Sequence, residues 1–256
     1  MTDSVPVSPK PRSTLKLAIW IACLAVLSGV LIALGSWQVQ RLQWKEALIA
    51  RVEARVHAAP QPAPGRSDWG AINAGDHEYL HVRVAGNFLH DDETRVYAST
   101  VLGPGYWIIT PLKAEDGTVV LVNRGFVPTD RRDVSTRKSG NPDGPVTVTG
   151  LLRLSEPGGT SMRSNVPAEG RWYSRDVAAI ASSHGLSDVA PYFIDADDTP
   201  NPGGLPVGGL TQVKFPNSHL GYALTWFGLA LMPLGLIVYL VFFERRRRDG
   251  ADRDAS

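Results

Sequence analysis

The sequence predicts an α+β membrane protein in which two transmembrane helices, N- and C-terminal, flank a mainly antiparallel β domain, barrel- or sandwich-like, with one short helix. Two long runs without charge, residues 17–40 and 220–243, predict the helices. The residues between them are rich in Gly and Pro and contain short alternating segments at regular spacing. Such spacing is typical of antiparallel sheets and barrels.

The composition excludes several classes of partner and site. The formal net charge is only +1 over 256 residues, and the basic residues show no nucleic-acid-binding pattern, so we expect no nucleic-acid partner. Cys23 is the single cysteine of the sequence. It excludes a disulfide framework, a zinc site built from cysteines and a covalent Cys-x-x-Cys-His haem attachment.

The N-terminal part predicts a short tail and a first membrane anchor. Residues 1–14 are expected to form a polar cytoplasmic tail. Residues 15–37 are expected to form the first transmembrane helix, continuing to about residue 58. A cleaved signal peptide is the alternative, because it would carry the same positive flank. Its apolar part would be only about 7–15 residues long, so we favour a retained anchor.

The C-terminal part predicts the second transmembrane helix, residues 219–243. Its 24 uncharged residues from Leu220 to Phe243 would span about 36 Å as a helix, and a hydrocarbon core is roughly 30 Å thick. A basic tail, residues 244–256, follows with four consecutive arginines. Because basic flanks stay cytoplasmic, both termini are expected inside and residues 59–218 in the periplasm. The absence of an Arg- and Ser-rich presequence favours a bacterial cell inner membrane over a mitochondrial one.

The β domain is predicted from period-two alternation and from turn residues. Gly86 is expected to end the first strand, and Pro111 to end a later one. A turn at residues 115–117 predicts a hairpin. The expected strands are residues 80–85, 95–99, 106–112, 118–122, 146–154, 192–194 and 210–215.

One short helix is predicted within this domain, over residues 174–184. Ser174 would cap its N-terminus through the side-chain oxygen. Val177 and Ile180 would lie on its apolar face, and Gly185 suits the position just after its end.

His219 is a candidate metal ligand at the start of the second transmembrane helix. Tyr222 and Trp226 lie three and seven residues further on, hence on the same helix face. A neutral imidazole beside aromatic rings at a membrane boundary is a plausible axial ligand for haem iron. The alternative is a histidine of an interfacial aromatic belt, which the same two neighbours support equally.

Arg124 and Gly125 follow an apolar strand and are expected to form a turn. Arg124 would either bind a carboxylate as a bidentate donor or make a structural ion pair at the strand end. The remaining histidines are too irregularly spaced for a metal site, and no hydrolase, kinase or nucleotide-binding signature occurs. We therefore expect a protein that is not an enzyme.

Six motifs, in this order, resemble the surfeit-locus protein 1 family, and the resemblance runs from Trp37 to about Phe227. They are Trp37-Gln-x-x-Arg41-x-x-Trp44, Tyr106-x-Ile-Ile-Thr110-Pro111, Leu121-Val-Asn-Arg-Gly-Phe-Val-Pro128, Trp172-Tyr-x-Arg175-Asp176, Phe193-Ile-Asp195-Ala and Asn217-x-His219-Leu-x-Tyr222-Ala-x-Thr225-Trp226-Phe. Each motif is weak alone, but their order makes the resemblance specific.

The resemblance implies an assembly factor of cytochrome c oxidase that binds haem a transiently. The implied partners are the haem-bearing oxidase subunit, the haem a synthesis machinery and the lipid bilayer. His219 would be the iron ligand, Trp226 and Tyr222 would contact the ring, and Trp37 or Arg41 would form the facing wall. A haem-independent scaffold, a chaperone that stabilises the subunit during respiratory-chain biogenesis, is the alternative. The structural or interaction positions implied by the motifs are Gly105, Arg124, Gly125, Arg175 and Asp176.

Overall fold

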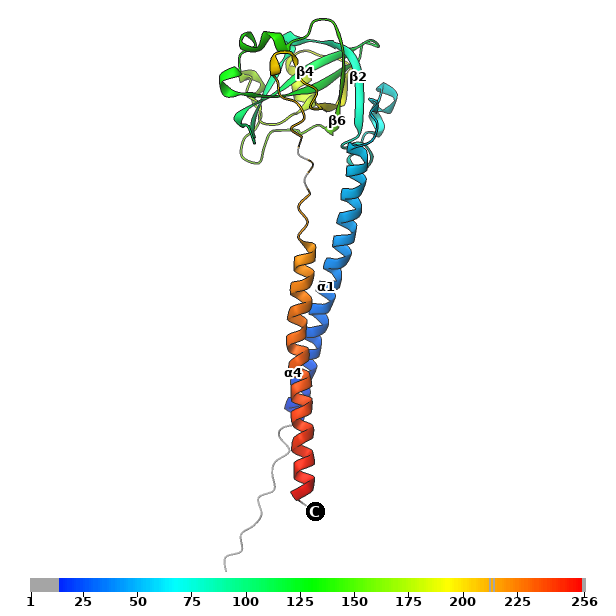
Figure 1. Ribbon diagram of the computed structural model, residues 1–256, viewed down its shortest axis with the longest axis vertical. Helices are drawn as coiled ribbons and strands as arrows, with labels where there is room; N and C mark the ends of the chain where they lie inside the picture. The colour runs from blue at the N-terminus through cyan, green and yellow to red at the C-terminus, as the bar shows by residue number, and fades with distance from the viewer. Residues whose placement is uncertain (1–13, 212, 214, 255–256) are drawn as a thin grey trace, which may run out of the picture. The chain divides into compact units, whose positions relative to one another are not determined.

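The structure, a computed structural model, describes residues 14–211, 213 and 215–254 (Figure 1). The chain forms two compact units, one from Met1–Ile49 with Phe215–Ser256 and the other from Ala50–Lys214. Two long apolar helices flank a mainly strand domain with short helices, which confirms the predicted fold class. Apart from Thr14, the predicted N-terminal tail lies outside the described residues.

The helical unit contains most of α1, Thr14–Val56, and all of α4, His219–Asp254. Both helices are long and apolar enough to cross a membrane. Their apolar side chains are largely exposed, for example Trp20 at 66% and Met232 at 72%. Such surface is stable only against lipid, so the protein is membrane-associated. Helix α4 continues through residues 244–254, for which the sequence had predicted only a basic tail.

Small residues allow α1 and α4 to pack closely within this unit, and Figure 1 shows the two helices side by side. Ser28, Gly35, Ala223 and Ala230 are all buried. A Cβ atom added at Gly35 would lie 2.6 Å from the ring of Phe227 on α4, so only glycine permits this approach. Close packing through small residues is the usual mode of helix association in lipid.

The second unit is a closed five-stranded barrel with two additional strands. The sheet order is β1-β2-β6-β7-β5-β4-β3, and a further pairing of β2 with β4 closes the ring. The β5–β7 pair is parallel, whereas the other pairs of the ring are antiparallel. The strands are β1 Gln61–Pro62, β2 His81–Phe88, β3 Thr94–Thr100, β4 Gly103–Ala114, β5 Val119–Pro128, β6 Pro145–Leu154 and β7 Val189–Ala196.

Two apolar clusters lie on opposite faces of the barrel strands. Val120, Leu152 and Ile194 belong to the cluster that fills the barrel. Leu121 and Phe193, one residue away in each strand, belong to the cluster beneath α3, because successive side chains of a strand point to opposite faces.

Helix α3, Val177–Ser183, is shorter than predicted and has a different cap. The side chain of Asp176, not Ser174, accepts the hydrogen bond from Ala179 N, at 3.1 Å. Ser174 is buried and its hydroxyl donates to Glu156 O instead. Gly185 follows the helix with a φ of +63°, as its sequence position predicted.

Two predicted strand ends are wrong, for topological reasons. At Gly86, β2 pairs with β6 on one side and begins to pair with β4 on the other, so the strand passes through a barrel corner. A Cβ atom there would overlap Lys113 O, which explains the glycine. Pro111 lies inside β4, between the residues that pair with β3 and those that pair with β2. Its missing N–H group therefore costs little.

The last predicted strand, residues 210–215, is absent from its described part. Leu210, Thr211, Val213 and Phe215 are in no strand, and residues 212 and 214 lie outside the described residues. Strand β5, in contrast, is longer than the predicted residues 118–122, and its extension contains Arg124 and Gly125.

Candidate functional site

His219 is the first residue of α4, and its backbone N–H points toward the side chain of the preceding Asn217. The distance from His219 N to Asn217 Oδ1 is 3.4 Å. Asn217 thus accepts one of the backbone donors left free in the first turn of a helix. The imidazole is half-buried, which places it at the boundary of the apolar part of α4.

The imidazole of His219 contacts Gln38 on α1. The distance from His219 Nδ1 to Gln38 Oε1 is 2.8 Å. As placed, the amide oxygen of Gln38 faces the ring, and an amide oxygen only accepts hydrogen bonds. With this amide orientation the contact is a hydrogen bond when Nδ1 carries the proton, and in that tautomer Nε2 keeps a free lone pair. This is the tautomer in which histidine binds a metal through Nε2.

The other predicted ring contacts belong to the same unit and differ in exposure. Tyr222 is 56% exposed and Trp37 is 54% exposed, whereas Trp226 is half-buried. The guanidinium of Arg41 lies 4.3 Å from the ring centre of Trp44, not beside His219. Among the predicted wall residues, neither Trp37 nor Arg41 makes a hydrogen bond or ion pair with the histidine in the described part of the chain.

Gln38 is the candidate site residue that sequence reasoning missed. It stands inside the first of the six motifs, directly after Trp37. Helix periodicity alone gave no reason to single out a glutamine on a face dominated by Trp37, Arg41 and Trp44. Gly35 could have indicated it, because Gly35 lies one turn before Gln38 on the same face of α1. That face is the one that packs against α4.

In the barrel, Asp195 on β7 is the centre of a buried polar network. Its carboxylate is 2% exposed and accepts hydrogen bonds from Arg175 at 3.0 Å and from Arg153 at 3.0 Å. Asn123 and Thr211 donate to it at 2.7 and 2.9 Å. The network ties β5, β6 and β7 to the segment before α3, so Arg175 stabilises the domain.

The charges of this network reinforce one another. Burial would lower the pKa of Arg175, but the negative charge of Asp195 and a hydrogen bond that Arg175 donates to Glu156 raise it above its ordinary value. Burial would likewise lower the pKa of Arg153, but the charge of Asp195 and a hydrogen bond to Glu78 raise it. Both guanidinium groups therefore stay charged, and Asp195 is the carboxylate they share.

Arg124 extends from β5 and holds two loops. Its guanidinium donates to Asn141 Oδ1 at 2.8 Å and to Gly140 O, and it lies 4.8 Å from the ring centre of Phe88. A weaker contact joins it to Asn201 Oδ1 at 3.5 Å. Burial lowers its pKa to about 10, although nearby Glu93 opposes this shift. No carboxylate forms an ion pair with Arg124 among the described residues, so the predicted ion pair is replaced by neutral oxygens.

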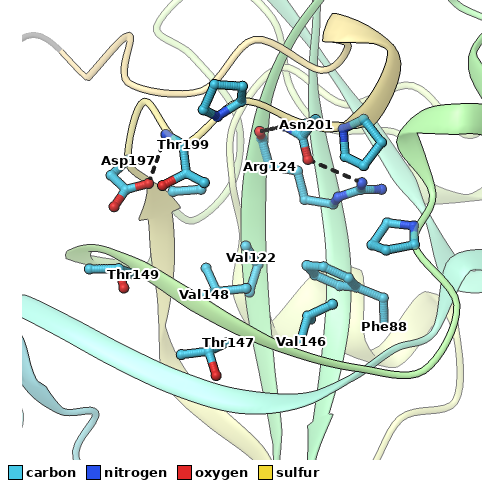
Figure 2. Close-up of a pocket in the computed structure, with 14 residues that line it drawn as sticks. Phe88, Val122, Arg124, Val146, Thr147, Val148, Thr149, Asp197, Thr199 and Asn201 are labelled. Atoms are coloured by element: carbon cyan, nitrogen blue, oxygen red, sulfur yellow. Dashed lines mark hydrogen bonds between the residues drawn. The ribbon is translucent and has the colours of Figure 1, made fainter.

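Figure 2 shows Arg124 at the wall of a cavity of about 300 Å³. The apolar walls include Phe88, Val122 and Val148, and two hydrogen bonds join Arg124 to Asn201 across the rim. The two terminal nitrogens of the guanidinium make these loop contacts, Nε is buried without a hydrogen-bond partner, and Arg124 is only 2% exposed. Arg124 therefore joins the loop that contains Gly140 and Asn141 to the loop that contains Asn201.

Gly125 and Gly105 permit close packing beside Arg124. Gly125 has a φ of +131°, in the region that favours glycine, and a Cβ atom there would overlap the backbone of Val207. A Cβ atom at Gly105 would overlap Val127 O and the ring of Phe126. Arg124 and Gly125 together lie opposite the single residue Ile108 of β4, so they form a bulge within β5 and not a turn after it.

The described residues contain no cluster of three or more His, Cys, Asp and Glu side chains that could hold a metal ion. A haem iron needs no such cluster, since it can be held by one protein ligand such as His219. The chemistry of its Nε2 atom fits a haem, whereas a zinc or calcium ion would need more donors.

Comparison with known proteins relates the chain to one family. Residues 25–231, which include Gln38 and His219, match the SURF1 family. Surfeit locus protein 1 of Mus musculus is 36% identical over 222 residues, 80% of this chain and 70% of the mouse protein. The Homo sapiens protein of the same name is 35% identical over 82% of this chain and 73% of its own. A SURF1-like protein of Monosiga brevicollis is 36% identical over 88% of this chain and 86% of its own. The family resemblance seen in the six motifs is thereby confirmed: the chain belongs to the SURF1 family.

Proposed function

We propose that this protein is a membrane-anchored assembly factor of cytochrome c oxidase. In this role it receives haem a from the haem a synthesis machinery, holds it transiently and assists its insertion into the haem-bearing oxidase subunit. Membership of the SURF1 family supports the role in oxidase assembly, and the two apolar helices support the membrane location. The protein would make and break one coordination bond and would not otherwise alter its cargo, so it is not an enzyme.

The observation that carries the haem proposal is the contact of His219 Nδ1 with Gln38 Oε1, at 2.8 Å. A hydrogen bond from the second ring nitrogen orients most metal-binding histidines and fixes their tautomer. Here it leaves Nε2 as the donor for the iron of haem a, for which histidine is a common axial ligand. Exposed aromatic side chains of the same unit, Trp37 and Tyr222, offer contacts to the macrocycle.

A single protein ligand suits a carrier. A haem held by two strong axial ligands would be released slowly, whereas a haem on His219 alone can be transferred when the subunit offers its own histidine. The hydrogen bond to Gln38 would keep the imidazole oriented while the haem is held.

The proposed location is a bacterial inner membrane, with both termini cytoplasmic and the barrel periplasmic. Four arginines, residues 245–248, follow the apolar part of α4, and Lys16 precedes that of α1. Basic residues next to a span favour the cytoplasmic side.

Oxidase maturation in cells tests this function. A strain without the protein would receive either the wild type or His219→Ala, and haem a per oxidase subunit would be measured in membranes. We expect His219→Ala to lower the haem a content several-fold while the subunit remains present. His57→Ala, which changes an exposed histidine bonded to Glu53 O, is the matched control. The scaffold alternative predicts wild-type haem content with His219→Ala, and that result would overturn the haem role.

Gln38→Leu is expected to weaken haem a binding by about 10- to 100-fold, the usual cost of losing a hydrogen-bond partner of a metal-binding histidine. Titration of the purified protein with haem a measures the affinity. Gln40→Leu is the control, because Gln40 is an exposed glutamine on the same helix. Equal affinity of the Gln38→Leu variant and the wild type would show that Gln38 does not support the ligand.

A further inference from the structure

An open groove of about 210 Å³ on the barrel domain combines positive charge with aromatic rings. Its lining contains four arginines, three tyrosines and one tryptophan, but no carboxylate. The chain as a whole is nearly neutral, with a formal charge of +1. This accumulation of cations is therefore a local feature. The lining is Arg95, Tyr97, Tyr106, Arg132, Arg163, Gly170, Arg171, Trp172 and Tyr173.

Two of these arginines have no carboxylate partner in the described part of the chain. Arg132 lies 5.6 Å from the ring centre of Tyr106, and Arg163 lies 5.4 Å from that of Tyr173. Both side chains are exposed and contact the rings through their flat guanidinium faces or stems. Their N–H groups thus remain available to an anionic ligand.

The positive charges of the other two arginines are only partly neutralised by nearby carboxylates. Arg95 is 3.8 Å from the exposed carboxylate of Asp133, beyond hydrogen-bond distance. Arg171 pairs with Glu169, where both side chains are 56% exposed. Exposed pairs of this kind are weak and can exchange partners at little cost.

Three tyrosine rings lie next to one another between the cations. The ring centre of Tyr97 lies 6.1 Å from that of Tyr106, edge to face, and 6.4 Å from that of Tyr173, at a tilt. Tyr97 is 44% exposed because alternation along β3 places it on the face opposite the buried Val96 and Ala98. Arginine, tyrosine and tryptophan are the residues that dominate binding energy in protein interfaces.

The groove lies beside β3, an edge strand whose edge is partly covered. Strand β3 is the last strand of the sheet order, and beyond it the described residues supply one bridge, between Val96 and Trp172. Tyr97 N donates to Trp172 O at 2.8 Å, so the backbone edge is occupied at the groove itself. In the described part of the chain no strand pairs with the rest of this edge, and that part can accept an extended chain by backbone pairing.

We propose that this groove binds an extended acidic segment of a partner protein. Charge complementarity selects the acidic side chains, the tyrosine rings contact their aliphatic parts, and the part of the β3 edge beyond the bridge to Trp172 favours an extended backbone. A lipid headgroup or free phosphate is less well matched, because it needs donors that converge on one point. Here the guanidinium groups come from β3 and from two separate loops. The inference goes beyond the proposed haem role and does not depend on it.

Fluorescence anisotropy of labelled hexaglutamate with the purified full-length protein tests the proposal. We expect binding that weakens with salt. The double variant Arg132→Glu with Arg163→Glu should weaken it by about tenfold or more, because it reverses two charges. The control variant Arg83→Glu with Lys113→Glu carries the same charge change on exposed strand residues outside the groove, and it should change the affinity less than twofold.

Three results would overturn the proposal. The first is no binding of hexaglutamate by the wild type, and the second is an equal loss in the control variant. The third is displacement of the peptide by equimolar pyrophosphate or glycerol phosphate, which would assign the groove to a small phosphate or a lipid headgroup. The haem a content of the double variant distinguishes this inference from the haem proposal, since we expect it to equal that of the wild type.

Discussion

Asp195→Ala is expected to destabilise the barrel domain by about 3–5 kcal/mol, the range found when one member of a buried ion pair is removed. Arg153 and Arg175 each donate to this carboxylate at 3.0 Å. Without it, two largely buried guanidinium groups would lose their shared counter-ion. Of their remaining partners, Glu78 pairs with Arg153, and Glu156 pairs closely with Arg175 but is 3.9 Å from Arg153.

Urea unfolding of the full-length protein, followed by near-ultraviolet circular dichroism, measures this effect. Asp91→Ala, at an exposed carboxylate, should change the midpoint little. In a double-mutant cycle, Arg175→Met should recover part of the loss, because removing both partners costs less than leaving one charge unpaired. If Asp195→Ala were as stable as Asp91→Ala, the network would not stabilise the domain.

Gly125→Ala is the second change with a large expected effect, a loss of at least about 3 kcal/mol. Its φ of +131° disfavours any residue with a Cβ atom, and the added methyl would overlap the backbone of Val207. The conformational cost alone is about 1–2 kcal/mol. The overlap adds to it because the neighbour is backbone of the isolated bridge to Phe126, which cannot rotate away.

Gly144→Ala separates these two costs. Gly144 also has a positive φ, +83°, but an added Cβ atom would meet open space. We expect Gly144→Ala to cost only the conformational part, about 1–2 kcal/mol, in the same unfolding experiment. Equal midpoints for the two variants would contradict the close approach of Val207 to Gly125.

The sequence predicted the order of helices and strands because periodicity is local. It could not predict the closure of the barrel, which depends on a pairing between β2 and β4 far apart in the chain. Gly86 and Pro111 were therefore interpreted as strand ends. In the structure they lie where a strand changes neighbours, and there a missing side chain or N–H group is tolerated.

The candidate site divides in the same way. His219 was identifiable from its place at the start of an apolar helix, but its partner required the packing of α1 against α4. Gly35 packs against Phe227, so the face of α1 that carries Gln38 faces α4. A glutamine alone does not indicate which helix face is buried. The bulge at Arg124 and Gly125 likewise needed the register with β4.

The most direct test of His219 as iron ligand is the absorption spectrum of the detergent-purified protein, produced together with haem a synthesis. We expect the wild type and His57→Ala to carry haem a with a Soret band typical of histidine ligation. His219→Ala should retain little or no haem in the same preparation. Equal haem occupancy and an unchanged Soret band in His219→Ala would contradict the account.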